Sequence, residues 1–251
     1  MFVKGAIPGW LARAGQALLG VVYPPACIAC GAAIAVPHGL CARCWAGLRF
    51  IERPYCERLG TPFAADHGLA LVSPAAIADP PVYARARAVA RYEETARLLV
   101  HRLKYSDRLD TARALGAMMA RAGREIAPEC DLVVPVPLHR ARLWRRRFNQ
   151  SMELARPVAE AHGLPLAADL LLRVKRTAPQ IGLSRNQRGL NLQGAFQVPP
   201  EARHRLKDRR ILLVDDVVTT GATANAASRA LLRAGAAAVD VLAFARVVQD
   251  A

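Results

Sequence analysis

The chain has 251 residues, of which 53% are hydrophobic, so it can bury the core of one good-sized domain together with that of a small one. Its 35 lysines and arginines outnumber its 20 acidic residues, and the formal net charge is +15. This excess favours nucleic acid, phosphorylated metabolites or an anionic membrane surface as partners, and the alternative is a merely solvated basic surface.

The first segment, residues 1–22, is predicted to form an N-terminal helix. It is apolar from Ile7 to Val22, but Arg13 and Gln16 interrupt it, and it is too short for a membrane span. It also lacks the charged start and small-residue cleavage site of a secretory signal. We therefore expect no transmembrane segment and a cytoplasmic protein, with association at the inner face of the membrane as the alternative.

Residues 23–62 contain most of the cysteines and are predicted to form a zinc-ribbon domain. Two C-x2-C pairs, "CIAC" and "CARC", are separated by ten residues. This spacing lets both thiolates of a pair face one ion, and two pairs complete a tetrahedral site of four sulfurs. A disulfide or a redox motif is the alternative, but disulfides are disfavoured in a reducing cytoplasm. We predict a structural Zn²⁺ bound by Cys27, Cys30, Cys41 and Cys44.

A third cysteine motif, "CERLG", repeats the form of "CIACG" without its second cysteine. Cys56 begins it, and Leu59 stands where the second ligand would be. It is interpreted as a degenerate third knuckle, in which Cys56 is either a free thiol or a substitute ligand. Residues 63–83 contain prolines and little charge, and they are predicted to form a linker.

Residues 84–251 are predicted to form a larger domain in which strands alternate with helices. The helical pattern that follows residue 108 offers Asp110 as an N-cap. The alternation predicts a mostly parallel, doubly wound α/β sheet. Strands are expected within residues 83–93, 131–138, 209–218 and 237–248, and helices within residues 94–105, 108–126, 149–163 and 222–235.

The stretch "ILLVDDVVTTGAT" carries the clearest chemistry. Ligands of open parallel sheets bind beyond the carboxyl ends of the strands, so Asp215 and Asp216 are expected at that solvent edge. The helix N-terminus that follows favours a phosphate, and Gly221 permits close approach of the backbone. Carboxylates can accept hydrogen bonds from hydroxyl groups or help to hold a divalent cation. The stretch therefore predicts a sugar-phosphate site; a buried strand with a capped helix would explain Thr223 but not two adjacent acids.

This stretch resembles the phosphoribosyl-pyrophosphate (PRPP) signature of type I phosphoribosyltransferases. The order of the cysteine knuckles, "HRLKYSDR", "DLVVPVPLHRARLWRRRFNQS", "QIGLSRNQRGLNLQGAF" and the signature is similar to that of the ComF family, competence-associated proteins with a zinc ribbon and a phosphoribosyltransferase-like domain. The resemblance runs from Cys27 to Val247. It implies a type I phosphoribosyltransferase-like fold and PRPP bound with Mg²⁺. The implied PRPP-binding residues are Asp215, Asp216, Thr219, Thr220, Gly221, Ala222 and Thr223.

The segment "PVPLHRARLWRRRFNQ" follows a strand, and the comparable loop of type I enzymes contacts pyrophosphate. Its arginines suit phosphates, and Trp144 and Phe148 among them also suit single-stranded nucleic acid; a basic loop with both aromatics in the core is the alternative. The family usually shows Arg-Gly-Phe-Asn-Gln where this chain has Arg147 in place of the glycine. The residues assigned to a pyrophosphate or nucleic-acid loop are Pro137, His139, Arg140, Arg142, Arg145, Arg146, Arg147 and Lys104.

Two functions follow from these features. The first is a PRPP-binding phosphoribosyltransferase-like protein linked to DNA uptake or competence, in which attack at C1 of the ribose would displace pyrophosphate. The second is a non-catalytic module that binds single-stranded DNA and retains the fold. The expected partners are PRPP, single-stranded DNA and competence or DNA-uptake proteins. His139 is a candidate acid or base by position alone, no acceptor is identifiable, and the "QIGLSRNQRGLN" segment is either a closing loop or a connector.

Overall fold

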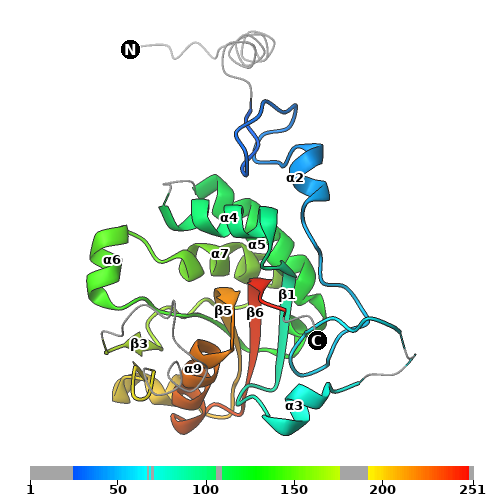
Figure 1. Ribbon diagram of the computed structural model, residues 1–251. Coiled ribbons are helices and arrows are strands. Elements are labelled where there is room, and N and C mark those ends of the chain that lie inside the picture. Colours follow the sequence, from blue (N-terminus) through cyan, green and yellow to red (C-terminus); the bar gives the residue numbers. More distant parts are fainter. Residues whose placement is uncertain (1–24, 67, 69–70, 106–108, 176–191, 249–251) are drawn as a thin grey trace, which may run out of the picture.

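The computed structural model describes residues 25–66, 68, 71–105, 109–175 and 192–248 (Figure 1). The helix predicted for residues 1–22 and the "QIGLSRNQRGLN" segment lie outside these residues. The described strands are β1 Arg85–Arg91, β2 Leu132–Pro135, β3 Leu172–Arg173, β4 Phe196–Gln197, β5 Arg210–Val218 and β6 Ala238–Arg246. The described α-helices are α2 Ala42–Ala46, α3 Pro74–Ala78, α4 Glu94–Tyr105, α5 Leu109–Ala122, α6 Arg140–Arg146, α7 Gln150–His162 and α9 Ala222–Arg233, with 3-10 turns η1 Gly123–Glu125, η2 Ala127–Glu129 and η3 Pro200–Arg205.

Four parallel strands form the main sheet in the order β1-β6-β5-β2, which confirms the predicted parallel sheet. Successive side chains of a strand point to opposite faces. On β5, Leu212 and Val214 therefore pack with α4, α5 and α7, whereas Ile211 and Leu213 pack with α9. Both faces of the sheet are buried by helices, as a sheet of continuous aliphatic runs requires.

Close packing between α5 and α7 depends on a glycine. A methyl group at Gly116 would lie 2.0 Å from Cγ of Pro157, which stands inside α7. The absence of a side chain on α5 therefore makes room for the proline ring on α7. The helix α5 begins at Leu109, so Asp110 lies in its first turn and is not the predicted N-cap. Its carboxylate instead lies 3.4 Å from Nδ1 of His38.

The cysteine-bearing segment packs on the larger domain. Ile28 and Leu48 share one hydrophobic core with Leu99 of α4. The chain then runs along the outer edge of β1, where the N–H of Ile51 donates to the C=O of Val89 at 2.9 Å. The residues predicted to form a linker, 63–83, include the helix α3. Within the described parts of the chain, no helix has the length and apolar character needed to cross a membrane.

The opposite edge of the sheet, formed by β2, is also occupied. The C=O of Pro165 accepts a hydrogen bond from the N–H of Val133 at 2.9 Å, and the N–H of Ala167 donates to the C=O of Val133 at the same distance. The strand β2 is therefore paired on both sides, with β5 on one and this short segment on the other. The hairpin-like pair β3–β4 is antiparallel and stands apart from the main sheet.

Candidate functional site

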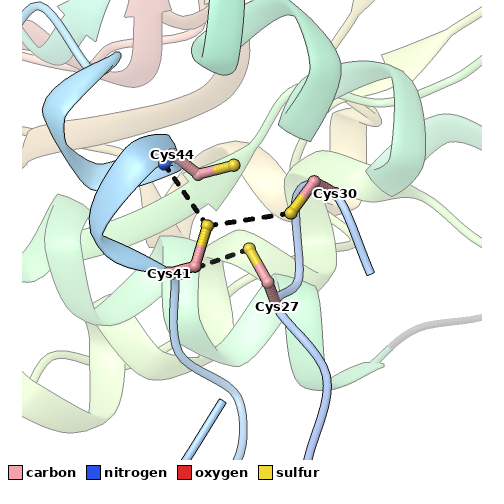
Figure 2. Close-up of side chains that lie close together, drawn as sticks. All are labelled: Cys27, Cys30, Cys41 and Cys44. Carbon is pink, nitrogen blue, oxygen red and sulfur yellow. Dashed lines mark hydrogen bonds between the residues drawn. The ribbon is translucent and has the colours of Figure 1, made fainter. Parts of the chain in front are cut away.

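The four cysteines predicted to bind zinc converge (Figure 2). Their sulfur atoms all lie within 4.8 Å of one another, and those of Cys30 and Cys41 are 3.7 Å apart. A zinc ion with Zn–S bonds of about 2.3 Å separates its sulfurs by about 3.8 Å, so the arrangement is close to that of a tetrahedral site. Backbone N–H groups approach the sulfurs as well, because the N–H of Cys41 lies 3.3 Å from Sγ of Cys27.

Burial, hydrogen bonds and neighbouring sulfurs shift the pKa values of two of these thiols in opposite directions. Burial opposes a charge on Cys27, but backbone N–H groups, led by that of Cys30, lower its pKa to about 6. Burial and the neighbouring sulfurs raise the pKa of Cys44 to about 12. Four thiolates at this spacing would repel one another without a positive charge among them, and a Zn²⁺ bound by these four cysteines would supply that charge. With four protein ligands the site is closed, so it supports structure and not catalysis.

The acidic pair lies further inside the sheet than the sequence predicts. The strand β5 runs on to Val218, because residues after the acids still pair with β6, and Asp215 itself lies beside Ala243. The side chain of Asp215 is buried and accepts hydrogen bonds from Oγ of Ser151 at 3.0 Å and from the N–H of Asp216 at 2.9 Å. The expectation of two solvent-edge carboxylates is thus wrong for Asp215.

Burial sets the acidity of Asp215. Removal from water, followed by the adjacent negative charge of Asp216, raises the pKa of Asp215 to about 7. Asp216 is half-buried, and its Oδ2 lies 2.6 Å from Nζ of Lys104 on α4. Although burial favours the neutral amine, the Asp216 carboxylate raises the pKa of Lys104 above its usual range. Lys104, assigned from the sequence to the pyrophosphate or nucleic-acid loop, therefore forms an ion pair with Asp216.

The predicted phosphate turn connects β5 to α9. Gly221 has a φ of 79°, in the left-handed region that favours glycine, and it precedes α9 without any side-chain cap. The N-cap residue of this 12-residue helix thus offers no side-chain acceptor to the N–H groups of the first turn. Thr219 is exposed, and Ala222 and Thr223 form the first turn of the helix. Oγ1 of Thr220 is buried and has no hydrogen-bond partner among the described residues.

The arginine-rich segment forms a short helix, α6, and not the predicted loop. None of its residues is buried. His139 caps this helix, since its Nδ1 accepts from the N–H of Ala141 at 3.3 Å, and Arg147 ends it with a φ of 63°. The position where the family usually has glycine therefore has the left-handed backbone that glycine favours. The exposed members of the predicted set are Arg140, Arg145 and Arg147, and the half-buried ones are Pro137, His139, Arg142 and Arg146.

The two aromatic residues of this segment differ in their surroundings. The side chain of Trp144 is 87% exposed, so the alternative that places it in the core is wrong. Phe148 is half-buried. Burial of the Trp144 side chain would stabilise the fold, so folding does not explain why this indole is exposed among arginines.

Two side chains near the acids were missed by the sequence analysis. Ser151, at the start of α7, donates to Asp215. Arg173, on β3, is buried; burial and the charge of Arg142 lower its pKa, and the charge of Asp215 opposes them. Arg173 thus lies within electrostatic reach of both α6 and the acidic pair. Ser151 is the last residue of the quoted segment that ends in "FNQS", so its motif could have drawn attention to it. Arg173 lies in an aliphatic run in which no motif indicates a site residue.

An open groove of about 1090 Å³ adjoins the phosphate turn. Its walls come from α9, β4 and η3, and Thr220 and Ala222 lie at the end near the turn. Arg203, Arg229 and Arg233 also line it, and all three are exposed. These cations extend the basic character of the surface beyond α6.

Two family models match the chain. One is described as a double zinc ribbon domain and matches residues 18–75; the other is described as a phosphoribosyl transferase domain and matches residues 159–250. DNA utilization protein YhgH of Escherichia coli (strain K12) is 34% identical over 236 residues, covering 91% of this chain and 100% of the relative. Competence protein F of Haemophilus influenzae is 30% identical over 216 residues, covering 83% of this chain and 91% of the relative.

Solved structures of similar fold include the glutamine phosphoribosylpyrophosphate amidotransferase from B. subtilis complexed with ADP and GMP. It matches with a TM-score of 0.38 and 26% identity, over 57% of this chain and 30% of that chain. HGPRT-ase from Leishmania tarentolae in complex with GMP matches with a TM-score of 0.32 and 17% identity, over 57% of this chain and 73% of that chain.

Proposed function

Because the chain belongs to the ComF family, which includes DNA utilization protein YhgH and competence protein F, we propose that its larger domain binds PRPP and serves DNA uptake or DNA utilization. One observation carries this proposal. An acidic pair near the carboxyl end of β5 is followed, five positions after Asp216, by a left-handed Gly221 and a helix N-terminus without a side-chain cap. Groups that can bind hydroxyls and groups that can bind a phosphate thus follow one another in a single strand–turn–helix connection, and a phosphorylated sugar carries both kinds of partner.

Each part of the proposed site has a distinct task. Asp216, held by Lys104, and the buried Asp215 would accept hydrogen bonds from the ribose hydroxyls. The N–H groups of the first turn of α9 and the unpartnered hydroxyl of Thr220 would hold the 5-phosphate. Arg142 and the neighbouring cations of α6 would face the diphosphate, and Mg²⁺ would neutralise its charge.

Titration calorimetry with PRPP and Mg²⁺ tests this assignment. The double variant Asp215→Asn with Asp216→Asn is expected to lose binding, and Asp169→Asn, which changes an exposed carboxylate paired with Arg205, is the matched control. Thr220→Val is expected to weaken binding by roughly tenfold, the worth of about one hydrogen bond to a charged group. Because the hydroxyl of Thr220 has no described partner, this variant should fold as stably as the wild type.

Unchanged affinity in the double variant would contradict the assignment of the acids. Turnover is a separate question. Release of pyrophosphate from PRPP, measured with and without candidate amine, nucleobase and nucleic-acid acceptors, decides whether binding leads to transfer. Release that depends on an acceptor and disappears in the double variant would make the protein a transferase. Binding of PRPP without release of pyrophosphate would mean that PRPP is a ligand and not a substrate.

The exposure of Trp144 favours a second function, binding of single-stranded DNA. An indole that is 87% exposed among arginines can stack on an unpaired base while the cations contact phosphates. Fluorescence anisotropy with an oligonucleotide at several salt concentrations measures the phosphate contacts. Trp144→Ala should weaken binding about 5-fold or more, since stacking contributes roughly 1–3 kcal/mol per base.

A matched control variant distinguishes between two candidate DNA-binding sites, the helix α6 and the zinc ribbon. Trp45 is 52% exposed and lies on α2, so Trp45→Ala removes a tryptophan of the ribbon. Loss of binding with Trp144→Ala alone places DNA on α6, and competition by saturating PRPP would then be expected. Loss with Trp45→Ala alone would contradict this placement. Equal affinity for single and double strands in all three proteins would reduce the effect to general attraction by a basic surface.

A further inference from the structure

The segment that begins at Cys56 repeats the backbone of the ribbon that begins at Cys27. In each, the C=O of the cysteine accepts from the N–H of a glycine four positions later, at 2.9 Å from Gly31 and 2.7 Å from Gly60. Both glycines have left-handed backbones, with φ of 82° and 65°. The N–H of each cysteine also donates to the carbonyl five positions later, at 2.7 and 2.8 Å. The two turns therefore share the same backbone hydrogen bonds and the same left-handed glycine.

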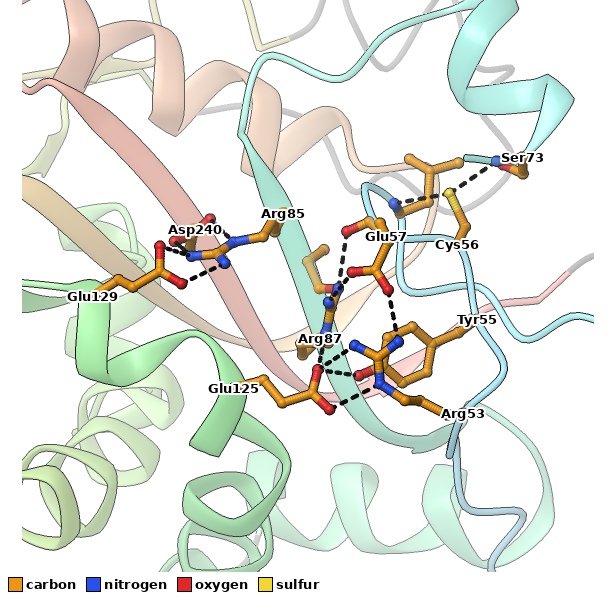
Figure 3. Close-up of polar contacts among 12 residues, drawn as sticks. Arg53, Tyr55, Cys56, Glu57, Ser73, Arg85, Arg87, Glu125, Glu129 and Asp240 are labelled. Atoms are coloured by element: carbon orange, nitrogen blue, oxygen red, sulfur yellow. Dashed lines mark hydrogen bonds and ion pairs between the residues drawn. The ribbon is translucent and has the colours of Figure 1, made fainter. Parts of the chain in front are cut away.

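The second half of each unit repeats as well. Cys41 is the N-cap of α2 and its sulfur accepts from the N–H of Cys44; Ser73 is the N-cap of α3 and its hydroxyl accepts from the N–H of Ala76. Both helices have five residues. The N–H of each cap residue donates to the sulfur of the first cysteine of its own unit, at 3.3 Å in the first and 3.2 Å in the second (Figure 3).

This correspondence identifies one retained cysteine and three vacated ligand positions. Cys27, Cys30, Cys41 and Cys44 of the first unit correspond to Cys56, Leu59, Ser73 and Ala76 of the second. The second unit thus keeps a single thiol where a structural zinc site needs four ligands. Among the described residues, the first unit is the only group of three or more potential ligands that could hold a metal ion.

We propose that residues 54–78 are a second ribbon that holds its shape without a metal, so that the chain binds one zinc ion and not two. Hydrogen bonds replace the ion. The buried sulfur of Cys56 accepts from the N–H of Leu59 at 3.4 Å and from the N–H of Ser73 at 3.2 Å (Figure 3). Leu59 packs against the core of the α9 face, and Ala76 is buried. Apolar contacts therefore occupy two of the former ligand positions.

Ion pairs fasten the metal-free ribbon to the sheet. Arg87 of β1 is 4% exposed, and its guanidinium donates to Oε2 of Glu57 at 2.7 Å (Figure 3). Arg53 donates to the other carboxylate oxygen of Glu57 at 2.7 Å, and it also forms a two-pronged pair with Glu125. Charge-assisted, bidentate contacts of this kind fix orientation strongly, which is the task that an ion performs in the first ribbon.

The zinc content of the full chain tests the proposal. By mass spectrometry of the metal, protein prepared without chelator should contain one zinc per chain. Cys41→Ser should contain none, and Cys56→Ser should still contain one, because Cys56 binds no metal. Two zinc ions in the wild type, or loss of zinc in Cys56→Ser, would overturn the proposal.

Restoring the missing cysteines of the second ribbon should add a second zinc ion. The triple variant Leu59→Cys, Ser73→Cys and Ala76→Cys should bind two zinc ions, and substitution with Co²⁺ should about double the thiolate charge-transfer absorption. The matched control uses Ala75→Cys in place of Ala76→Cys, so it carries as many cysteines but with one on the exposed face of α3, and it should bind one. A folded triple variant with one zinc would refute the correspondence. If the triple variant does not fold, the zinc content of the wild type and of Cys56→Ser still tests the proposal.

Discussion

Asp215 is a buried carboxyl whose charge opposes folding. Its pKa lies near 7, against 3.8 in an exposed aspartate. Between these two values the folded protein holds a proton that the unfolded chain has lost, so wild-type stability falls as the pH rises from about 4 to about 7 and changes no further above it. At 1.36 kcal/mol per pKa unit, the destabilisation above pH 7 has a ceiling of about 4 kcal/mol.

The variant Asp215→Asn removes this charge and keeps the shape. Its amide oxygen can still accept from Ser151 and from the N–H of Asp216. Urea unfolding should therefore show the variant more stable than the wild type at about pH 8, with the difference shrinking towards zero below about pH 4, where Asp215 is protonated in both the folded and the unfolded chain. Asp216→Asn is the control, because it breaks the ion pair with Lys104 and should lower stability at both pH values.

The result that would refute this reasoning is a variant equally destabilised at both pH values. A constant loss would mean that the carboxylate of Asp215 is stabilised in place, for instance by Arg173, more than burial penalises it. A gain that grows from about pH 4 to about pH 7 and then stays constant is the result expected of a buried carboxylate whose charge opposes folding.

Three further predictions concern packing, backbone and metal. Gly116→Ala should lower the free energy of unfolding by roughly 1–3 kcal/mol through the clash with Pro157, measured as a urea midpoint, and an unchanged midpoint would mean that α5 and α7 can separate at little cost. Arg147→Gly should raise stability by about 1 kcal/mol by relieving the left-handed backbone, and a loss would reveal contacts of the Arg147 side chain that outweigh the strain. Removal of zinc by a chelator should abolish hydrogen-exchange protection in residues 25–48 while the sheet stays protected, and collapse of the whole chain would mean that the core shared by the ribbon and α4 does not hold without the metal.

The sequence was sufficient to predict what depends on local pattern. Aliphatic runs alternating with amphipathic stretches predicted the parallel sheet, and C-x2-C spacing predicted the cluster of four sulfurs. The order of strand, acids and Gly221 likewise placed the candidate site at the end of β5. Each of these features lies within a short stretch of chain.

What the sequence could not predict depends on contacts between distant segments. Asp215 is buried because β6 extends beside it and α7 brings Ser151 to it, and neither fact is local. The helix α6 buries no side chain, so it has no apolar stripe by which a pattern could reveal it. Ser73 gave no sign of its relation to Cys56, since 17 residues separate them and only the folded turn brings its N–H to the sulfur.

The two edges of the main sheet bear on how copies of the chain could assemble. Unpaired edge strands are the usual route by which sheets of two molecules join into one. Here residues 49–51 pair with β1 at one edge, and residues 165–167 pair with β2 at the other. Both templates for strand addition are thus occupied within the monomer. Among the described residues, the main sheet therefore has a paired segment at each edge, which opposes fibre-like growth of that sheet from either side.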